Sequence, residues 1–235
     1  MKKIVVLTGA GISAESGIQT FRGTDGLWEG HNVMEVASPE GFKKNPSLVL
    51  DFYNKRRQQL LMVKPNKAHL ALTALEVHFN TTIITQNIDD LHERAGSSSI
   101  VHLHGELLKV RSSGEANGTA DGTLAWRKDL VLGDTCTNGY QLRPHIVWFG
   151  EQVPLFDKAI EITVQADILI IIGTSMQVYP AASLVNFISQ NTPIYVVDPK
   201  PNVRKNDFNN LTIIEKTAVN GVPDLVSKLI ANFSK

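Results

Sequence analysis

The stretch that decides the fold is Met1–Gly17, which reads MKKIVVLTGAGISAESG. Its run Ile4–Leu7 consists of β-branched and aliphatic residues, which predicts a strand buried on both faces. The strand should end in a glycine turn, where the backbone bends tightly and comes close to a ligand. A short helix opening at residues 13–16 would then offer free N–H groups to a phosphate. The spacing of Gly9 and Gly11 fits a dinucleotide-binding turn, but any strand-to-helix turn fits it as well.

Apolar runs and helical patterns alternate along the rest of the chain. Strands are expected at 82–85, 100–104, 168–172 and 194–197, and helices at 46–63, 67–79, 90–95, 154–165, 180–190 and 223–233. This alternation predicts an α/β fold with a Rossmann-like, mostly parallel sheet and helices on both faces. Residues 106–143 are rich in Gly, Ser, Thr and Asn with little periodicity, which indicates an insertion. We expect a Rossmann-like domain of residues 1–27, 67–105 and 144–235, and a small domain of residues 28–66 and 106–143.

The composition is that of a globular protein, with 43% hydrophobic and 20% charged residues. Lys plus Arg equals Asp plus Glu at 23 each, so no overall basic field favours nucleic acid. One cysteine excludes an internal disulfide, as expected in a reducing compartment. The first apolar run is too short for a signal peptide, and no run approaches membrane-spanning length. We therefore expect a cytoplasmic monomer without nucleic-acid or membrane partners.

One face of the helix expected at 46–63 carries an unusual pair of residues. Its inward stripe, at alternating steps of four and three, comprises Val49, Tyr53, Arg56, Leu60 and Val63. Tyr53 and Arg56 thus stand where apolar residues are expected. A solvated basic patch at residues 55–57 is the simpler interpretation, but the Tyr–Arg pairing on the inward stripe favours a site.

Polar residues follow the strand expected at 82–85, at the sheet edge where open α/β sheets bind ligands. They are Gln86, Asn87, Ile88 and Asp89. Asp89 could equally cap the helix at 90–95, and that role does not exclude the other. The strand at 168–172 likewise ends in small residues, Gly173, Thr174 and Ser175.

After the glycine turn comes a glycine-punctuated loop, residues 18–28, in place of a second strand. An extended loop carrying Phe21 and Arg22 over a phosphate site indicates a lid. Here the sequence resembles the sirtuin family, the NAD-dependent protein-lysine deacylases. The motifs that carry the resemblance are Gly9-Ala10-Gly11, Phe21-Arg22, Gln86 to Asp89, His104-Gly105, Trp148 to Glu151, Gly173 to Ser175 and Pro180 to Ala182. Gln19 stands where the family usually has proline.

The resemblance implies that NAD is consumed as a co-substrate. Nicotinamide leaves, and the acyl group of an acylated protein lysine passes to ADP-ribose. His104 is the expected general base, because imidazole titrates near working pH. His102 lies on the same strand face, but the family's His-Gly pair corresponds to His104 and not to His102. The other expected catalytic residues are Asn87 and Asp89. Phe21 is expected to cover the cleavage centre and Arg22 to approach the phosphates.

The remaining expected contacts divide between NAD and the acylated peptide. Those for NAD are Gly9, Ala10, Gly11, Ser13, Ala14, Phe21, Arg22, Gln86, Asn87, Ile88, Asp89, Gly173, Thr174, Ser175, Asp198 and Ala218. Those for the substrate are Tyr53, Arg56, Val147, Phe149, Gly150, Glu151 and Val178. Residues 147–151 resemble the strand segment to which the family's substrate peptide adds as an extra strand.

Tyr53 and Arg56 match the Tyr-x-x-Arg signature of the sirtuin branch that removes acidic acyl groups. A guanidinium and a phenol one helical turn apart can clamp a distal carboxylate. We expect a preference for succinyl- or malonyl-lysine, with some deacetylation.

The sequence departs from the family at the structural zinc, which two Cys-x-x-Cys pairs usually hold. Of these cysteines only Cys136 is present, with Gly139 where its neighbour would be. One thiol cannot supply four ligands, so we expect no structural zinc and no metal site. The small domain should instead be held by packing around Trp126, Leu130, Leu132 and Tyr140.

Other functions need the same NAD pocket. ADP-ribose transfer to protein and simple NAD hydrolysis are the alternatives within enzymes, and a non-catalytic NAD-binding sensor is the alternative outside them. The presence of His104 and Asn87 argues against a sensor.

Overall fold

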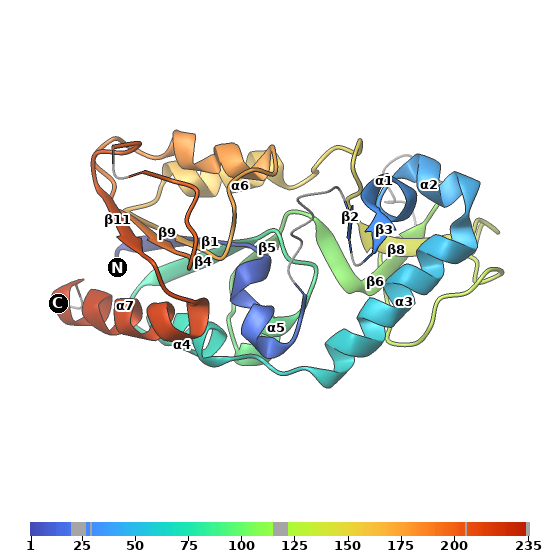
Figure 1. Ribbon diagram of the computed structural model, residues 1–235, viewed down its shortest axis with the longest axis horizontal. Coiled ribbons are helices and arrows are strands. Elements are labelled where there is room, and N and C mark those ends of the chain that lie inside the picture. The colour runs from blue at the N-terminus through green and yellow to red at the C-terminus, as the bar shows by residue number, and fades with distance from the viewer. Residues whose placement is uncertain (20–26, 29, 115–121, 205, 234–235) are drawn as a thin grey trace.

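A six-stranded parallel sheet forms the larger lobe of the computed structural model, which describes residues 1–19, 27–28, 30–114, 122–204 and 206–233 (Figure 1). Its strands are β1 Lys3–Thr8, β4 Asn80–Thr85, β5 Ile100–His102, β9 Ile168–Ile172, β10 Ile194–Val197 and β11 Leu211–Ile214. Across the sheet they run β11-β10-β9-β1-β4-β5. This is a doubly wound order, and it reverses between β1 and β9, where such sheets bind ligands.

Helices cover both faces of this sheet. Helices α4 (Lys67–Leu75) and α7 (Ala218–Phe233) pack on one face, and α6 (Phe156–Val164) with the 3-10 helix η3 (Ala181–Phe187) on the other (Figure 1). Because successive strand residues point to opposite faces, β1 gives Ile4 and Val6 to the first core and Val5 and Leu7 to the second. The predicted fold class is thereby confirmed.

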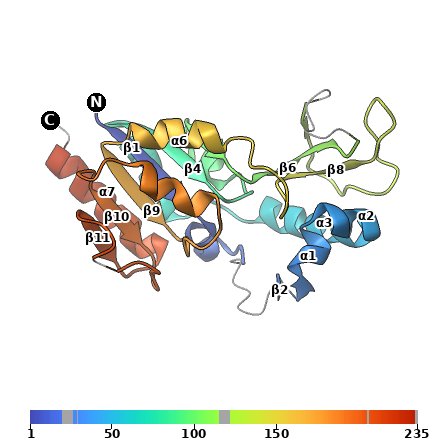
Figure 2. The ribbon, with the colours of Figure 1, turned by 90° about the horizontal axis from the view of Figure 1, so that it is seen from above.

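The smaller lobe lies beside the carboxyl ends of the strands (Figure 2). It contains helices α1 Val33–Val36, α2 Pro39–Lys44 and α3 Pro46–Met62, an antiparallel sheet of β6 Gly105–Ser112, β7 Leu124–Ala125 and β8 Leu142–Ile146, and the pair β2 Leu27–Trp28 and β3 His31–Asn32. The boundary expected at residue 144 falls inside β8. Three short elements lie near the strand ends: the 3-10 turns η1 Ala10–Ile12 and η2 Ala14–Ser16, and helix α5 Leu91–Ala95. No helix in these described ranges is long and apolar enough to cross a membrane.

Two asparagines begin the helices on either side of the lobe junction. The Asn45 side chain accepts from the N–H of Leu48, and Pro46 occupies the first turn of α3. The Asn66 side chain accepts from the N–H of Ala68 to begin α4. Its amide also donates to the carbonyl of Ile12, at 2.8 Å, so the same residue ties α4 to the glycine turn.

Several predicted elements need correction. The helix expected at 13–16 is the single 3-10 turn η2, which follows the turn η1, and that expected at 180–190 is the 3-10 helix η3. The strand expected at 100–104 ends at His102, so His104 lies beyond it. The last helix begins at Ala218 instead of Pro223, because the Glu15 carboxylate accepts from the N–H of Val219 and satisfies its first turn.

The segment 106–143 is also more regular than predicted. Residues 105–112 form β6, and their burial alternates as in a strand with one buried face. Strand β11 was missed as well, although its sequence, LTII, is apolar and β-branched.

The packing of the small lobe differs in part from expectation. Leu130 is fully buried, in a cluster with Leu50, Val110, Cys136 and Leu142 against which Trp126 and Phe42 pack. Leu132 and Tyr140, by contrast, are 54% and 50% exposed. Leu130 and Cys136 therefore pack the segment 122–141 against α3 and β6, with Leu130 the more deeply buried of the two.

We predict that Leu130→Ala lowers the free energy of unfolding by about 2–5 kcal/mol, because it leaves a cavity in a closed apolar cluster. Urea denaturation measures this change. The matched control is Leu132→Ala, whose exposed side chain should give a loss within about 0.5 kcal/mol. Equal losses in the two variants would contradict this description of the core.

Candidate active site

Two glycines bring the carboxyl ends of β1 and β9 into backbone contact. The N–H of Gly9 donates to the carbonyl of Ile172 at 3.0 Å, and that of Gly11 to the carbonyl of Gly173 at 2.8 Å. A Cβ on Gly11 would lie 2.5 Å from the Cα of Gly173. Gly173 has φ +61°, a conformation that favours glycine. The glycines are required here by the close approach of two main chains.

The donors available to a phosphate are different from those expected. The glycine N–H groups already donate to the carbonyls of Ile172 and Gly173, and η1 and η2 are single turns without an extended helix dipole. The N–H groups of Ala10, Thr174 and Ser175, by contrast, donate no hydrogen bond within the part of the chain that the structure describes. All three residues line one pocket. They form a cradle of unused donors suited to an anion.

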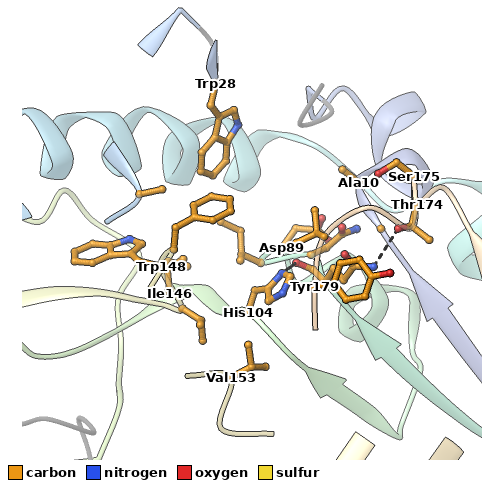
Figure 3. A pocket seen from close by; sticks show the side chains of 18 of the residues that line it. Ala10, Trp28, Asp89, His104, Ile146, Trp148, Val153, Thr174, Ser175 and Tyr179 are labelled. Carbon is orange, nitrogen blue, oxygen red and sulfur yellow. Dashed lines mark hydrogen bonds between the residues drawn. The ribbon is translucent and has the colours of Figure 1, made fainter. Parts of the chain in front are cut away.

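This pocket, of about 310 Å³, runs from the strand ends of the sheet toward the smaller lobe (Figure 3). Thr174 and Ser175 lie at one end of it, Trp148 at the other and His104 between them. Of the predicted site residues, the ones that line it are Gly9, Ala10, Gly11, Tyr53, Gln86, Asn87, Ile88, Asp89, His104, Val147, Phe149, Gly150, Glu151, Gly173, Thr174, Ser175 and Val178.

His104 presents a free basic nitrogen in this pocket. Its Nδ1 lies 3.0 Å from the carbonyl oxygen of Gln86, which can only accept, so Nδ1 carries the proton and Nε2 a lone pair. Burial lowers the pKa of His104 by more than this carbonyl raises it. The ring is therefore neutral near pH 7, which is the state that a general base needs.

Asn87 and Asp89 are joined through Ser13. The Asn87 amide donates to Ser13 Oγ at 3.2 Å, and Ser13 Oγ donates to Asp89 Oδ2 at 2.9 Å. Asp89 Oδ1 accepts from the N–H of Leu91, the first residue of α5, at 3.1 Å, but the N-cap position itself is Asp90, so the expected N-cap role of Asp89 is wrong. These bonds leave the Asn87 side-chain oxygen available to a ligand. Ser13 does not line the pocket itself, but it connects two residues that do.

Tyr53 lies at the opposite end, in the smaller lobe. Its hydroxyl oxygen accepts from Trp148 Nε1 at 3.0 Å, and burial raises its pKa. Since the indole only donates, the hydroxyl proton is free to point elsewhere. Arg56 lies behind the pocket lining: its Cζ is 3.2 Å from the ring centroid of Phe52 and 4.9 Å from that of Trp28.

The basic patch considered for residues 55–57 is not present. Arg56 and Arg57 are buried and Lys55 is exposed. Arg57 donates to the Asn54 side chain and the carbonyl of Leu107, and burial lowers its pKa to about 10. Of the predicted inward stripe, Val49, Tyr53, Arg56 and Leu60 are buried, and Val63 is half-buried just beyond the end of α3.

Residues 147–151 form a turn, so the expectation of a strand there is wrong. Strand β8 ends at Ile146, and the N–H groups of Val147 and Phe149 donate to the carbonyls of His104 and Ala37. Glu151 closes the turn by accepting from the N–H of Trp148 at 2.7 Å. Its carboxylate also pairs with Arg143 and Arg111, at 2.6 and 3.1 Å.

Four other predicted residues lie away from the pocket lining. Ala14 is exposed in η2 and Ala218 is buried at the start of α7. Asp198 is buried after β10, where it accepts from the N–H of Lys200. Arg56 is the fourth, as described above. Phe21 and Arg22 fall outside the described residues.

The pocket also contains residues that the sequence analysis did not select as contacts. They are Ile18, Gln19, Trp28, Ala37, Ile146, Trp148, Val153, Tyr179 and Pro180. Trp148 and Pro180 lie inside motifs quoted above, so the motifs pointed to them. Ala37 and Val153 carry no polar group, and only the three-dimensional arrangement reveals them.

The chain's single thiol does not fit a structural zinc. Cys136 Sγ lies in the apolar cluster of Leu130, with Ser112 Oγ at 3.5 Å. Elsewhere among the described residues, Glu93, His102 and Glu106 place ligand atoms within 4.8 Å of one another. Glu93 is already hydrogen-bonded to His102, and Glu106 to Lys109.

The strand order and the cradle define a dinucleotide-binding protein of the doubly wound α/β class. Comparison with known proteins is more specific: a model of the Sir2 family matches residues 9–180. A Helicobacter pylori (strain ATCC 700392 / 26695) protein named NAD-dependent protein deacylase is 60% identical over 98% of both chains. One of the same name from Bacteroides thetaiotaomicron is 50% identical, over 98% of this chain and 99% of that protein.

Solved structures agree with this result. A Sir2 homologue in complex with NAD has a TM-score of 0.85 and 38% identity, covering 98% of this chain and 90% of that one. A complex of Sir2 with a p53 peptide and NAD+ has a TM-score of 0.76 and 30% identity, covering 97% and 92%. The chain belongs to the Sir2 family, and the sirtuin resemblance is confirmed.

The buried carboxyl of Asp89 makes stability depend on pH. Burial raises its pKa from 3.8 to about 6, against its hydrogen bonds from Leu91 and Ser13. A raised folded-state pKa favours the protonated acid, so stability falls as the pH rises from about 4 to about 6, by up to roughly 3 kcal/mol.

We predict that Asp89→Asn removes this fall. Urea denaturation measures the free energy of unfolding of both proteins. Relative to the wild type, the variant should become more stable as the pH rises from 4 to 7. Asp157→Asn, on the exposed face of α6, controls for the loss of a surface charge. A difference for Asp89→Asn that is constant over this range would disprove the assignment.

Proposed function

We propose that the chain is an NAD-dependent protein-lysine deacylase, which transfers the acyl group to ADP-ribose with release of nicotinamide. The observation that carries the proposal is the neutral His104, whose free Nε2 lies in the same pocket as Asn87 and the cradle of N–H groups. The pocket extends from the cradle to Trp148, whose indole donates to Tyr53 in the smaller lobe.

NAD supplies the ribose that receives the acyl group and nicotinamide as the leaving group. The N–H groups of Ala10, Thr174 and Ser175 would bind its phosphates, and the Asn87 side-chain oxygen would accept a hydrogen bond from a ribose hydroxyl. His104 Nε2 would take the proton of the hydroxyl that attacks the acyl carbon. Burial of these groups keeps water from competing with that hydroxyl.

We predict that acylated peptides and NAD yield O-acyl-ADP-ribose, detected by mass spectrometry. His104→Ala should lower kcat at least about a hundredfold, because it removes the base, while NAD still protects against thermal unfolding. His78→Ala, in the turn between α4 and β4, is the histidine control. ADP-ribosylated protein as the product would instead show an ADP-ribosyltransferase, and free ADP-ribose without acyl transfer would show an NAD hydrolase. NAD binding without turnover would show a non-catalytic sensor.

A second step of the proposal concerns the acyl group. Tyr53 can donate its hydroxyl proton into the pocket, and Arg56 lies one helical turn away against Trp28, which lines the pocket. A guanidinium close behind the acyl end favours a distal carboxylate, as in succinyl- or malonyl-lysine. Charged hydrogen bonds of this kind contribute roughly 1.5–3 kcal/mol.

We predict that Arg56→Met lowers kcat/KM for a succinyl-lysine peptide at least about tenfold more than for an acetyl-lysine peptide. Lys55→Met removes the exposed neighbouring cation and should change neither value more than twofold. Equal losses for the two peptides with Arg56→Met would show that Arg56 only supports the fold.

The proposal also includes three expectations from the sequence: that the chain divides into a Rossmann-like domain and a small domain, that it is a monomer, and that it is cytoplasmic. The pocket lies where the two parts meet, and acylated proteins are its proposed substrates.

A further inference from the structure

The main chain is held on both sides of the Asn87 Cα, by one contact to each of the two peptide groups that flank it. Its N–H donates to Thr85 Oγ1 at 3.0 Å, and its carbonyl oxygen lies 3.1 Å from His102 Nδ1. The direction of the Asn87 side chain depends on the orientation of these two peptide groups. The two contacts together therefore help to fix the side-chain amide that faces the pocket.

The N–H side is anchored in the sheet. Thr8 Oγ1 donates to Thr85 Oγ1 at 2.8 Å, and His92 Nε2 lies 3.1 Å from Thr8 Oγ1. All three side chains are fully buried. The contact to the Asn87 N–H is therefore closed to solvent.

The carbonyl side reaches a second group that can titrate. His102 Nε2 lies 2.6 Å from Glu93 Oε1, while its Nδ1 faces the Asn87 carbonyl. Both neighbours are acceptors, and only an imidazole with both nitrogens protonated donates to both. The geometry thus requires a charged His102, paired with Glu93 at the surface of α5.

We propose that His102, held by Glu93, is a positioning residue for Asn87, which it orients through the Asn87 carbonyl. The proposal rests on the function proposed above, because it assigns His102 a role in placing Asn87 at the ribose. It differs from a plain surface ion pair, which would not use Nδ1. It also differs from the role of His104, whose Nε2 faces the pocket directly.

The proposal makes the position of Asn87 sensitive to pH. When His102 loses a proton, one nitrogen must present a lone pair to an acceptor, and one of the two contacts is lost. The charged or titratable groups around this ring are Glu93 and His92 from α5, Glu106 and Lys109 from β6, and Asp89. Burial lowers the pKa of His102, but the Glu93 carboxylate outweighs burial and the net direction is upward. The contact should therefore weaken on the alkaline side.

The direct test follows the Asn87 carbonyl by NMR, with 13C at that carbonyl and 15N in the histidine rings. In the wild type we expect the Asn87 carbonyl shift to titrate together with the His102 ring. With Glu93→Gln the same transition should move to lower pH, and with His102→Leu it should disappear. A carbonyl shift that ignores His102 titration, in a folded protein, would overturn the proposal.

The kinetic test uses the same variants. His102→Leu should lower kcat at least tenfold and change the KM for NAD less than threefold. His102→Gln keeps one hydrogen-bond donor, so it should restore at least half of the lost kcat on a logarithmic scale. Glu161→Gln, which removes an exposed carboxylate on α6, is the matched control and should stay within twofold. A kcat for His102→Leu within twofold of wild type would also overturn the proposal.

The role of His102 and the proposed deacylase function can each be disproved without the other. Glu93 is 40% exposed in its side chain, so Glu93→Gln serves where His102→Leu does not fold. If the wild-type chain gives no O-acyl-ADP-ribose, the proposed function fails, while the NMR titration still decides whether His102 holds Asn87.

Discussion

The approach of two main chains at Gly11 and Gly173 is the constraint on which the site depends. A Cβ at either position would lie within 2.6 Å of backbone atoms of the other loop, so side chains are excluded. The contact brings the loop after β1 against the loop after β9, and the Gln86 side chain, which donates to Thr174 Oγ1 at 3.1 Å, adds the loop after β4. Three strand ends thereby share one fixed edge. Asn66 connects the same turn to α4, so the helical layer also holds it.

The smaller lobe reaches this edge by a different kind of packing. Helix α3 buries aromatic and cationic residues on its inward stripe, and Trp148 links them to β8 by donating to Tyr53. Arg143 lies over the Trp148 ring at 3.3 Å and pairs with Glu151. A buried cation that meets both a carboxylate and an aromatic face avoids the cost of an unpaired charge. This arrangement fixes the end of the pocket that lies in the smaller lobe.

The sequence predicted the sheet better than the small lobe. The runs at 168–172 and 194–197 match β9 and β10 residue for residue, because a strand buried on both faces must be apolar throughout. Glycine spacing located the cradle but not its donors, since the use of each N–H depends on which strand lies opposite. Leu132 and Leu130 are equally apolar in sequence, and only the path of the loop decides that one is buried. The lining residues Ala37 and Val153 carry no chemical signal that a sequence could show.

His102 and His104 illustrate how far residue type alone determines chemistry. They are two positions apart, both partly buried, and each directs Nδ1 at a carbonyl oxygen, of Asn87 and Gln86 respectively. Their second nitrogens differ: His102 meets the Glu93 carboxylate, whereas His104 Nε2 has no hydrogen-bond partner among the described residues. The carboxylate raises the pKa of His102 in spite of burial, and burial lowers the pKa of His104 in spite of its carbonyl. A charged histidine is a poor base but a firm donor, and a neutral one is the reverse. A histidine can therefore serve as a hydrogen-bond donor at one of these positions and as a proton acceptor at the other.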